Sequence, residues 1–423
     1  MLEDRLQQLL DDAAPDPPVA IDVESVRRGA RRRRARGAAI ALAGTSLAIA
    51  GLTAGLVTLL GDQDAPGHPD LGHPPTSDAG TTGWERLPDL PLSPRWGSLT
   101  TWTGEEALVV GGYSQRYIGG PAPRADLRDG AAFDPDAGTW RAVAKAPLPL
   151  DEESSTLLTG GTWVVVSDRH WLAYDLDTDS WRRLPAPPTG ILQPSLAGTG
   201  DLVYALDLYG AENDNAPVQV LDLATRTWAT LPDSPFRPRL DQRTLVTTPQ
   251  GLVVMGDDLA PRQAGNRSET ARAELWDGHT WRRFPSSDLQ GCCWHWTGQR
   301  IVSGYRVTRQ QSEKGGLHTF HAGALDPATG GWAALPWSPP TRDDMLYGQI
   351  TGWGPVVFST GYLYDDATGR STAVSAPAHL SDGAVALSSD RLMVFGGYRT
   401  SGPPGVFPTE VTPSNDAWSL RVG

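Results

Sequence analysis

The sequence predicts an all-β domain built from seven similar four-stranded units, preceded by one transmembrane α-helix. Three observations predict it: a tryptophan that recurs every 41 to 56 residues, a polar turn before most of these tryptophans, and an uncharged stretch of 24 residues near the N-terminus. The composition agrees, because 39% of the 423 residues are apolar and 16 are tryptophan, which is enough for a large core. Nearly all basic residues are arginine, which is typical of a bacterial coding bias.

The first 60 residues divide into a charged tail and an apolar segment. Residues 1–36 hold eight arginines and seven acidic residues, and seven of the arginines lie between Arg27 and Arg36. Residues 37–60 hold no charge, and a helix of this length, rising about 1.5 Å per residue, crosses a hydrocarbon layer of about 30 Å. Arginines beside a span stay on the cytoplasmic side. The sequence therefore predicts a single-pass plasma-membrane protein with a cytoplasmic N-terminus and an extracytoplasmic domain.

A cleaved signal peptide is the alternative, but 36 residues precede the apolar run, and the run exceeds the usual length of about 7–15 residues. Four leucines share one face of a short helix in the tail and predict a docking surface for a cytoplasmic partner: Leu2, Leu6, Leu9 and Leu10. Residues 61–82, rich in Gly, Pro and Asp, predict a linker. Residues 61–423 carry 28 basic and 42 acidic side chains, which argues against a nucleic-acid partner.

The repeated unit is a β-hairpin. An apolar strand enters a turn rich in Asp, Thr and Gly, and a second strand opens on tryptophan and closes near proline, as in FDPDAGTWRAVAKAP. Asp and Thr bond their own backbone in such turns, Gly supplies positive φ, and Pro ends the strand pairing. The tryptophans of the repeat are Trp84, Trp140, Trp181, Trp228, Trp281 and Trp332. A sixth hairpin, YDDATGRS, has Ser371 where tryptophan is expected.

Seven further β-rich runs lie between the tryptophans: EALVVGGY, TWVVVSD, DLVYALD, GLVVMGD, RIVSGYR, GPVVFSTG and RLMVFGGY. Together with the hairpins they give four strands per interval, which predicts a seven-bladed β-propeller over residues 83–423. The strand at Trp84 stands alone at the start, and the last copy, NDAWSLRV, lacks its outer strand. We therefore expect the N-terminal strand to close the last blade, which removes a free sheet edge.

The repeat resembles the kelch repeat. It has a double glycine after the second strand, at Gly111 and Gly112 and again at Gly396 and Gly397, followed by the acidic hairpin turn and tryptophan. This resemblance covers residues 83–423 and implies a kelch-type, galactose-oxidase-like propeller. The copper site of galactose oxidase, with two Tyr, two His and a Cys cross-linked to one Tyr, is not recognisable in this sequence. We therefore expect no cofactor and no metal, and the resemblance leaves open whether the protein is an enzyme.

Candidate ligand-binding residues stand where the innermost strands are expected to begin, because these starts ring the mouth of the propeller. They are Arg95, Glu152, Gln193, Arg239, Cys292, Asp343 and His379. Cys292 and Cys293 are adjacent, so a disulfide between them would hold Cα atoms about 3.8 Å apart and would be strained. A disulfide and two buried thiols remain equally open. With Trp294, a disulfide would form an apolar platform that suits a sugar ring.

Five long insertions follow the second strands and should gather on one face, where propellers commonly bind ligands. Three of them carry clustered bases: Arg116, Arg124 and Arg128; Arg262, Arg267 and Arg272; Arg306, Arg309 and Lys314. Such a rim favours an anionic ligand, although a general preference for arginine also explains it. The sequence thus predicts an extracytoplasmic binding or sensing module for a cell-wall glycan or a protein partner. A galactose-oxidase-like or other carbohydrate-active enzyme is the alternative.

Overall fold

The computed structural model describes residues 45–46, 83–115, 126–208, 217–234, 240–258, 270–287, 289, 291, 293–304, 308–311, 317–320, 322–336, 346, 350–359, 361–377, 380–400 and 411–422. The expected tail and linker lie outside these residues, and so does the expected span except for Thr45–Ser46, which form β1. In the described part of the chain, no helix is long and apolar enough to cross a membrane. The transmembrane helix therefore stays a prediction.

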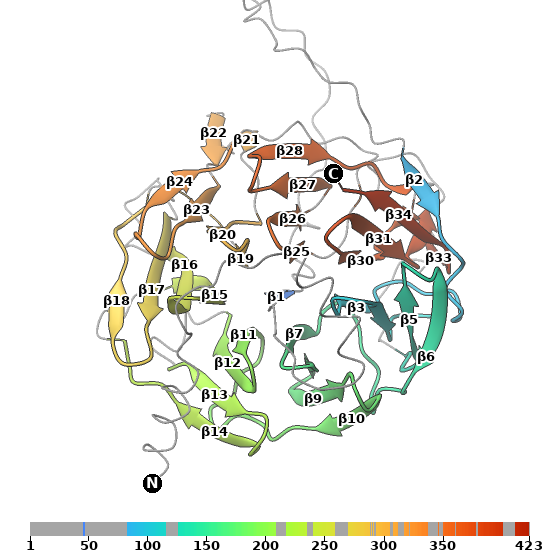
Figure 1. Cartoon of the computed structure of the whole chain (residues 1–423), viewed down its shortest axis with the longest axis horizontal. Helices are drawn as coiled ribbons and strands as arrows, with labels where there is room; N and C mark the ends of the chain where they lie inside the picture. The colour runs from blue at the N-terminus through green and yellow to red at the C-terminus, as the bar shows by residue number, and fades with distance from the viewer. Residues whose placement is uncertain are drawn as a thin grey trace, which may run out of the picture.

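Antiparallel sheets stand side by side in a ring (Figure 1). Within the described residues, seven sheets contain four or five strands each, and their neighbouring strands are antiparallel and hydrogen-bonded. Apart from β1 and β2, which join from the N-terminal side, the strands of each sheet follow one another along the chain as a meander. In each sheet one end lies near the centre of the ring and the other at the rim (Figure 1). The arrangement is that of a β-propeller.

The first four of these sheets, from the centre outward, are β3 (Leu99–Trp102), β4 (Ala107–Val110), β5 (Gly130–Asp134) and β6 (Thr139–Val143); β7 (Ser155–Thr159), β8 (Thr162–Ser167), β9 (His170–Asp175) and β10 (Ser180–Arg183); β11 (Pro194–Thr199), β12 (Leu202–Asp207), β13 (Gln219–Asp222) and β14 (Thr227–Thr230); β15 (Leu240–Thr248), β16 (Gly251–Asp258), β17 (Thr270–Trp276) and β18 (Trp281–Arg283). The strand β1 pairs with the inner edge of β7.

The remaining three sheets are β19 (His295–Trp296), β20 (Ile301–Val302), β23 (Gly323–Leu325) and β24 (Trp332–Ala334); β25 (Thr351–Trp353), β26 (Val356–Ser359), β27 (Tyr362–Asp365) and β28 (Arg370–Ala373); β30 (Ala384–Leu387), β31 (Arg391–Phe395), β34 (Ala417–Arg421) and β2 (Trp84–Arg86). Two smaller sheets accompany the seven. One consists of β21 (Thr308–Gln311) and β22 (Leu317–Phe320), which follow β20. The other consists of β29 (Leu380–Ser381), which precedes β30, and of β32 (Tyr398–Thr400) and β33 (Val411–Pro413), which follow β31.

The last sheet takes its outermost strand from the N-terminal side of the domain. Strand β2 pairs antiparallel with β34, with Trp84 opposite Leu420 and Arg86 opposite Trp418. The prediction that the N-terminal strand closes the last sheet is confirmed. The chain thereby covers an edge that would otherwise present unpaired backbone groups.

The hairpin turns have the predicted chemistry. The carboxylate of Asp134 accepts hydrogen bonds from the backbone N–H groups of Asp136 and Ala137, both at 2.9 Å. Asp175 and Asp222 bond the equivalent backbone groups of their own turns. Each turn therefore satisfies its own backbone and fixes the register of the tryptophan that follows.

Tryptophan side chains also join neighbouring sheets. Each indole N–H donates to a backbone carbonyl just after the outermost strand of the preceding sheet: Trp84 to Ser375 (2.9 Å), Trp140 to Pro88 (3.0 Å), Trp181 to Ala144 (2.9 Å), Trp228 to Pro185 (3.0 Å), Trp281 to Pro232 (2.8 Å) and Trp332 to Pro285 (3.0 Å). We call these contacts indole clamps. They explain why the repeat uses tryptophan rather than another large apolar residue.

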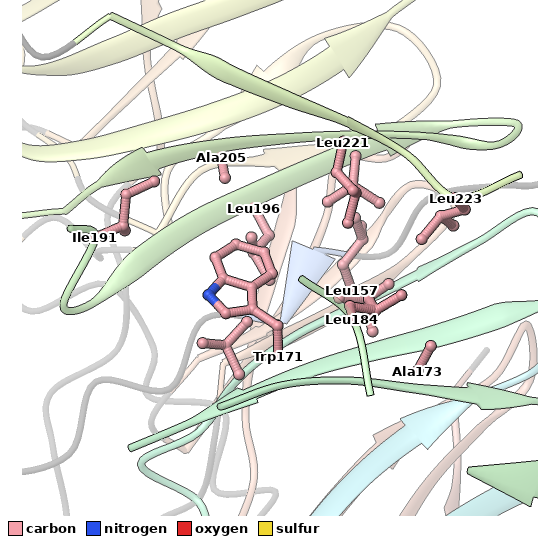
Figure 2. Packing of buried hydrophobic residues seen from close by; sticks show 12 residues of the cluster. Leu157, Trp171, Ala173, Leu184, Ile191, Leu196, Ala205, Leu221 and Leu223 are labelled. Carbon is pink, nitrogen blue, oxygen red and sulfur yellow. The ribbon is translucent and has the colours of Figure 1, made fainter. Parts of the chain in front are cut away.

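The core lies between the sheets. Figure 2 shows one such layer, in which Trp171 and Leu157 of one sheet pack against Leu196 and Leu221 of the next. All four residues are at most 2% exposed. Burying a side chain of this size contributes about 1.5–3 kcal/mol, so these layers carry most of the stability of the ring.

The double glycines are required by a close approach of two backbones. Gly111 and Gly112 have φ of +74° and +99°, and a Cβ on Gly111 would lie 2.2 Å from the carbonyl oxygen of Leu150. The Gly112 N–H donates to that same carbonyl at 2.7 Å. A side chain at either position would break this junction between the first two sheets.

Candidate binding site at the mouth of the ring

Three of the seven predicted mouth residues are described, and each lies just before an innermost strand. Arg95 precedes β3, Glu152 precedes β7, and the exposed Gln193 directly precedes β11. The other four lie outside the described residues, and their role in ligand binding stays a prediction: Arg239, Cys292, Asp343 and His379.

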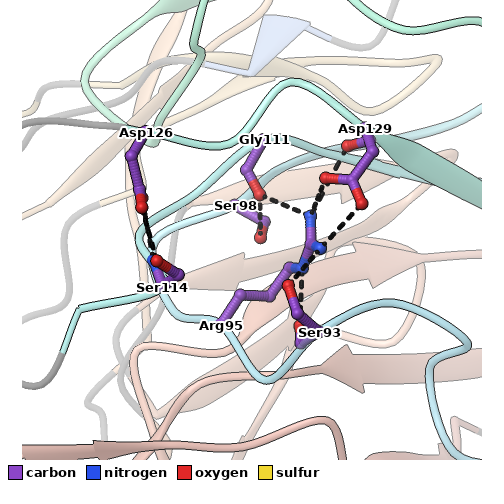
Figure 3. A network of polar contacts seen from close by, with 7 residues as sticks. All are labelled: Ser93, Arg95, Ser98, Gly111, Ser114, Asp126 and Asp129. Carbon is purple, nitrogen blue, oxygen red and sulfur yellow. Dashed lines mark hydrogen bonds and ion pairs between the residues drawn. The ribbon is translucent and has the colours of Figure 1, made fainter.

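Arg95 forms part of the frame of the mouth. Its side chain is fully buried, and its guanidinium forms an ion pair with Asp129 at 2.9 Å and donates to the Gly111 carbonyl at 3.1 Å (Figure 3). Its Nε donates to the carbonyl of Ser93 at 2.9 Å, and its backbone N–H donates to the carbonyl of Ser414. Arg95 therefore ties the entry of the first sheet to the closing sheet, and fixes the position of its neighbour Trp96.

The predicted sugar platform around Trp294 is not on the surface. The Trp294 side chain is 1% exposed, and its ring packs edge-on against Trp332 with centroids 5.9 Å apart. Because the core covers the face of this ring, the Trp294 side chain is not accessible for ligand contact. Cys293 is also buried, at 4% exposure. Because Cys292 is not described, the disulfide stays a prediction.

Three aromatic rings meet beside the start of β3. Trp96 stacks on Tyr113 with ring centroids 4.4 Å apart and an interplanar angle of 26°, and Tyr398 meets Trp96 edge-on at 5.8 Å. The backbones of Trp96 and Tyr113 exchange hydrogen bonds of 3.2 and 2.8 Å. Trp96 and Tyr398 remain partly exposed. The first and last sheets thus jointly present an aromatic surface at the mouth.

Three carboxylates line the same place. Tyr113 donates its hydroxyl hydrogen to Asp151 at 2.9 Å, and the Tyr398 hydroxyl bonds the carboxylate of Asp382. Glu152 lies between them, because its backbone N–H donates to the carbonyl of Gly97 at 3.0 Å and the Gly97 N–H donates to the carbonyl of Asp382 at 3.4 Å. We call Trp96, Tyr113, Asp151, Glu152, Asp382 and Tyr398 the mouth cluster.

Burial raises the pKa values of all three carboxylates of the mouth cluster. Burial raises the pKa of Glu152 to about 8, and the charges of Asp382 and Asp151 add to this effect. Burial also raises the pKa of Asp382 and of Asp151. Arg95, the neighbour of Trp96 along the chain, forms its ion pair with Asp129, outside the cluster. The mouth cluster is therefore an acidic, partly buried site that a positive charge would stabilise.

Gly97 allows the cluster to be this tight. Its φ is +60°, and a Cβ at this position would lie 1.8 Å from a carboxylate oxygen of Glu152 and 2.7 Å from the Tyr113 ring. Only glycine lets the Glu152 carboxylate rest on the backbone between Trp96 and Ser98.

Sequence reasoning located Glu152 but missed the two tyrosines. Tyr113 and Tyr398 each follow a double glycine, and the triplet GGY occurs after the second strand in the first and last sheets. Those sheets are neighbours only because the ring closes. The repeated triplet was the available signal, and combining it with the predicted closure would have brought the two tyrosines together.

The predicted arginine rim is largely outside the described residues, which contain none of Arg116, Arg124, Arg262, Arg267, Arg306 and Lys314. Arg128 is exposed and donates to the carbonyl of Pro147 at 3.2 Å. An anionic ligand at the rim therefore stays a prediction.

Comparison with known proteins agrees with the repeat. No protein-family model matches the sequence. The Kelch-like protein terF of Aspergillus terreus (strain NIH 2624 / FGSC A1156) is 25% identical over 186 residues, which cover 38% of this chain and 40% of that protein. The chain thus spans less than half the length of this curated relative. The solved structure of YjhT covers 78% of this chain and 95% of its own, with 13% identity and a TM-score of 0.40.

The ring of antiparallel sheets defines the fold: the chain forms a β-propeller, and part of its sequence is similar to a kelch-like protein. The mouth cluster lies at the end of the ring where innermost strands begin.

Proposed function

We propose that this protein is a membrane-tethered, seven-bladed binding module whose mouth cluster holds a glycan that bears protonated amino groups. The observation that carries the proposal is the combination of three aromatic rings with three carboxylates beside the innermost strands of the first, second and last sheets. Each of the seven sheets corresponds to one blade.

The chemistry of the cluster matches an amino sugar. A sugar ring presents an apolar face that stacks on tryptophan, and Trp96 is partly exposed for this contact. A protonated amine beside the rings gains a cation–π contribution of about 0.5–2 kcal/mol, and the carboxylates of Glu152 and Asp382 add charge attraction. Without a ligand, Glu152 is largely protonated near neutral pH because its pKa is about 8. A bound amine would favour its ionised form, because the positive charge stabilises the carboxylate.

The decisive experiment is a binding titration of the solubilised full chain with glucosamine oligomers and with N-acetylglucosamine oligomers of the same length. We expect only the amine-bearing oligomers to bind. Asp382→Asn should weaken their binding about tenfold, the equivalent of about 1.4 kcal/mol. Glu85→Gln, which removes an exposed carboxylate on β2, is the matched control and should bind like the unaltered chain.

Three outcomes would overturn the proposal. Binding of acidic polysaccharides alone would move the site to the arginine rim. Equal binding of a lysine-rich peptide would point to a protein partner. Equal binding of both oligomers, unchanged in Asp382→Asn, would show that the carboxylates do not select the ligand.

An enzyme is the second candidate, and one observation favours it. Glu152 has a raised pKa and lies near two further carboxylates, which is the combination that glycoside hydrolases use for a general acid and its partner. Release of new reducing ends from the oligomers, abolished in Glu152→Gln, would establish this activity. Oligomers recovered intact after prolonged incubation would rule it out for these substrates.

The tethering is a proposal from residues 1–60, with residues 1–36 in the cytoplasm and the propeller outside. Added protease should digest the propeller on intact cells and spare a tag at the N-terminus. A cleaved tag together with an intact propeller would show that the protein has the opposite orientation.

A further inference from the structure

We propose that the ring has one built-in seam, between the sheet β19-β20-β23-β24 and the sheet β25-β26-β27-β28. At this joint a polar latch replaces the indole clamp that joins the other neighbouring sheets. The seam is the place where the ring opens first. Three independent observations converge on it.

The first observation is the missing clamp. Ser371 lies opposite Tyr364 in the β27–β28 pairing, which is the register that Trp181 has opposite Tyr174 in β9–β10. In five of the other joints the clamp acceptor directly follows a buried apolar residue, as Pro185 follows Leu184; in the sixth, Pro88 follows the half-buried Leu87. The equivalent carbonyl here belongs to Pro336, after Leu335. Ser371 has no indole to reach it, so this joint lacks the clamp.

The second observation is the small apolar layer at this joint. Counting described residues, five are buried between the two sheets: Val302, Ala322, Ala324, Leu335 and Val357. Each of the six other joints buries at least ten. Among the described residues, this layer contains two alanines and no tryptophan, whereas every other layer contains tryptophan. The described apolar contact is therefore smaller at this joint than at the others.

The third observation is the polar latch at the edge of this layer. Asp366, in the turn after β27, forms an ion pair with Arg300 and accepts a hydrogen bond from the hydroxyl of Thr297 at 2.8 Å, both in the turn between β19 and β20. The Tyr364 hydroxyl donates to the same carboxylate at 3.2 Å. The Asp366 side chain is 3% exposed, so these hydrogen-bonding partners shield its carboxylate from solvent.

The inner strands of the seam also meet through a polar side chain. His295 of β19 is 4% exposed, and its ring lies against Gly352 of β25: a Cβ on Gly352 would be 2.5 Å from the nearest ring atoms. A buried imidazole on a glycine replaces the aliphatic contacts that join inner strands elsewhere, such as Leu157 with Leu196. The joint therefore depends on polar groups from its inner edge to its outer edge.

An open seam would separate the two sheets without breaking either one. Each sheet keeps its own hydrogen-bonded meander, because no ladder crosses between them. Opening exposes the apolar layer between the two sheets and separates Asp366 from its partners in the turn between β19 and β20, Thr297 and Arg300. A ring with one such joint can widen at its centre while the other six clamped joints stay closed.

Native-state hydrogen exchange on the full chain tests this inference. Amides of β20 and β26 should exchange at least about tenfold faster than those of β8 and β12, since a sheet that has separated from its neighbour loses packing on one face and its strands then unpair more readily. Ser371→Trp should restore a clamp to Pro336 and slow exchange at the seam about tenfold, which is the effect of one added hydrogen bond with burial. Asp366→Asn should accelerate it by a similar factor.

Two comparisons keep the test specific. Glu106→Gln breaks the ion pair between Glu106 and Arg141 inside the first sheet, and should leave exchange at β20 and β26 unchanged. Added salt should speed exchange of the unaltered chain at the seam, which tests the latch even where Asp366→Asn does not fold. Amides of β20 and β26 that exchange as slowly as those of β8, or a folded Ser371→Trp chain with unchanged exchange at the seam, would overturn the inference.

Discussion

Replacing Glu152 by glutamine should stabilise the protein at alkaline pH and flatten its pH dependence. The Glu152 carboxyl binds its proton more tightly in the folded chain, where its pKa is about 8, than in an unfolded chain with the ordinary value of 4.5. Between these two values the folded state holds more protons than the unfolded state. The free energy of unfolding therefore falls as pH rises from about 4.5 to about 8, and is level above that.

The size of the effect follows from the same pKa shift. One pKa unit corresponds to about 1.4 kcal/mol, so the shift of Glu152 sets a ceiling of about 5 kcal/mol. The side chain is partly exposed, and solvent screens its neighbours, so we expect about 2 kcal/mol. Glutamine keeps the shape of the side chain and removes the charge that Asp382 and Asp151 oppose. At pH 9 the Glu152→Gln chain should be more stable by this amount.

The assay is urea unfolding of both chains at pH 6 and pH 9, followed by tryptophan fluorescence. The unaltered chain should lose stability between the two pH values, and Glu152→Gln should lose much less. Glu85→Gln, an exposed glutamate changed in the same way, should behave like the unaltered chain. Parallel pH profiles for all three chains would show that Glu152 is not the group responsible, and would refute the reasoning about its burial.

Two further predictions concern the frame of the ring. Trp228→Phe removes the indole N–H that donates to the Pro185 carbonyl but keeps an aromatic ring beside Trp171. It should lower the free energy of unfolding by about 1–2 kcal/mol with an unchanged denaturant slope. An unchanged free energy of unfolding would mean that the indole clamp does not contribute to stability. Arg95→Met leaves Asp129 without its buried partner and should lower the free energy of unfolding by about 3 kcal/mol in the same assay. It should also weaken binding of glucosamine oligomers, because Arg95 holds its neighbour Trp96 in position. Full stability of Arg95→Met would show that the ion pair contributes nothing to the frame.

The fold could be predicted from the sequence because its signals are local and repeated. The Asp-rich turn before Trp140 fixes a hairpin through hydrogen bonds within a few residues, and the same turn recurs before Trp181 and Trp228. The closing strand was also predictable, since an unpaired strand at Trp84 and a missing outer strand after β34 complement each other. The replacement of tryptophan by Ser371 was visible in the repeat alignment, but its physical meaning was not.

The candidate site was predictable only in part, because its members meet through the closure of the ring. Glu152 was placed at the mouth by counting strands, but its contact with Gly97 depends on a positive φ that the residue type alone does not reveal. Asp382 lies three residues beyond the predicted His379. Arg95 was predicted as a ligand contact because it stands where the first innermost strand begins, whereas its pairing with Asp129 depends on backbone positions after β4. Patterns along the chain do not encode such partners.

The pairing of β2 with β34 also sets the order of events during synthesis. Residues 84–86 leave the ribosome long before their partner strand, and everything from β3 to β31 is made in between. The six other sheets complete themselves from consecutive strands as they emerge, but the last cannot, so the earliest strand of the propeller must wait for the final one. Until then the edges of β2 and of the growing ring are both open to other chains. Slow translation of the last sheet would prolong this period, and a chain stalled before Ala417 would expose the edge of β31 to aggregation.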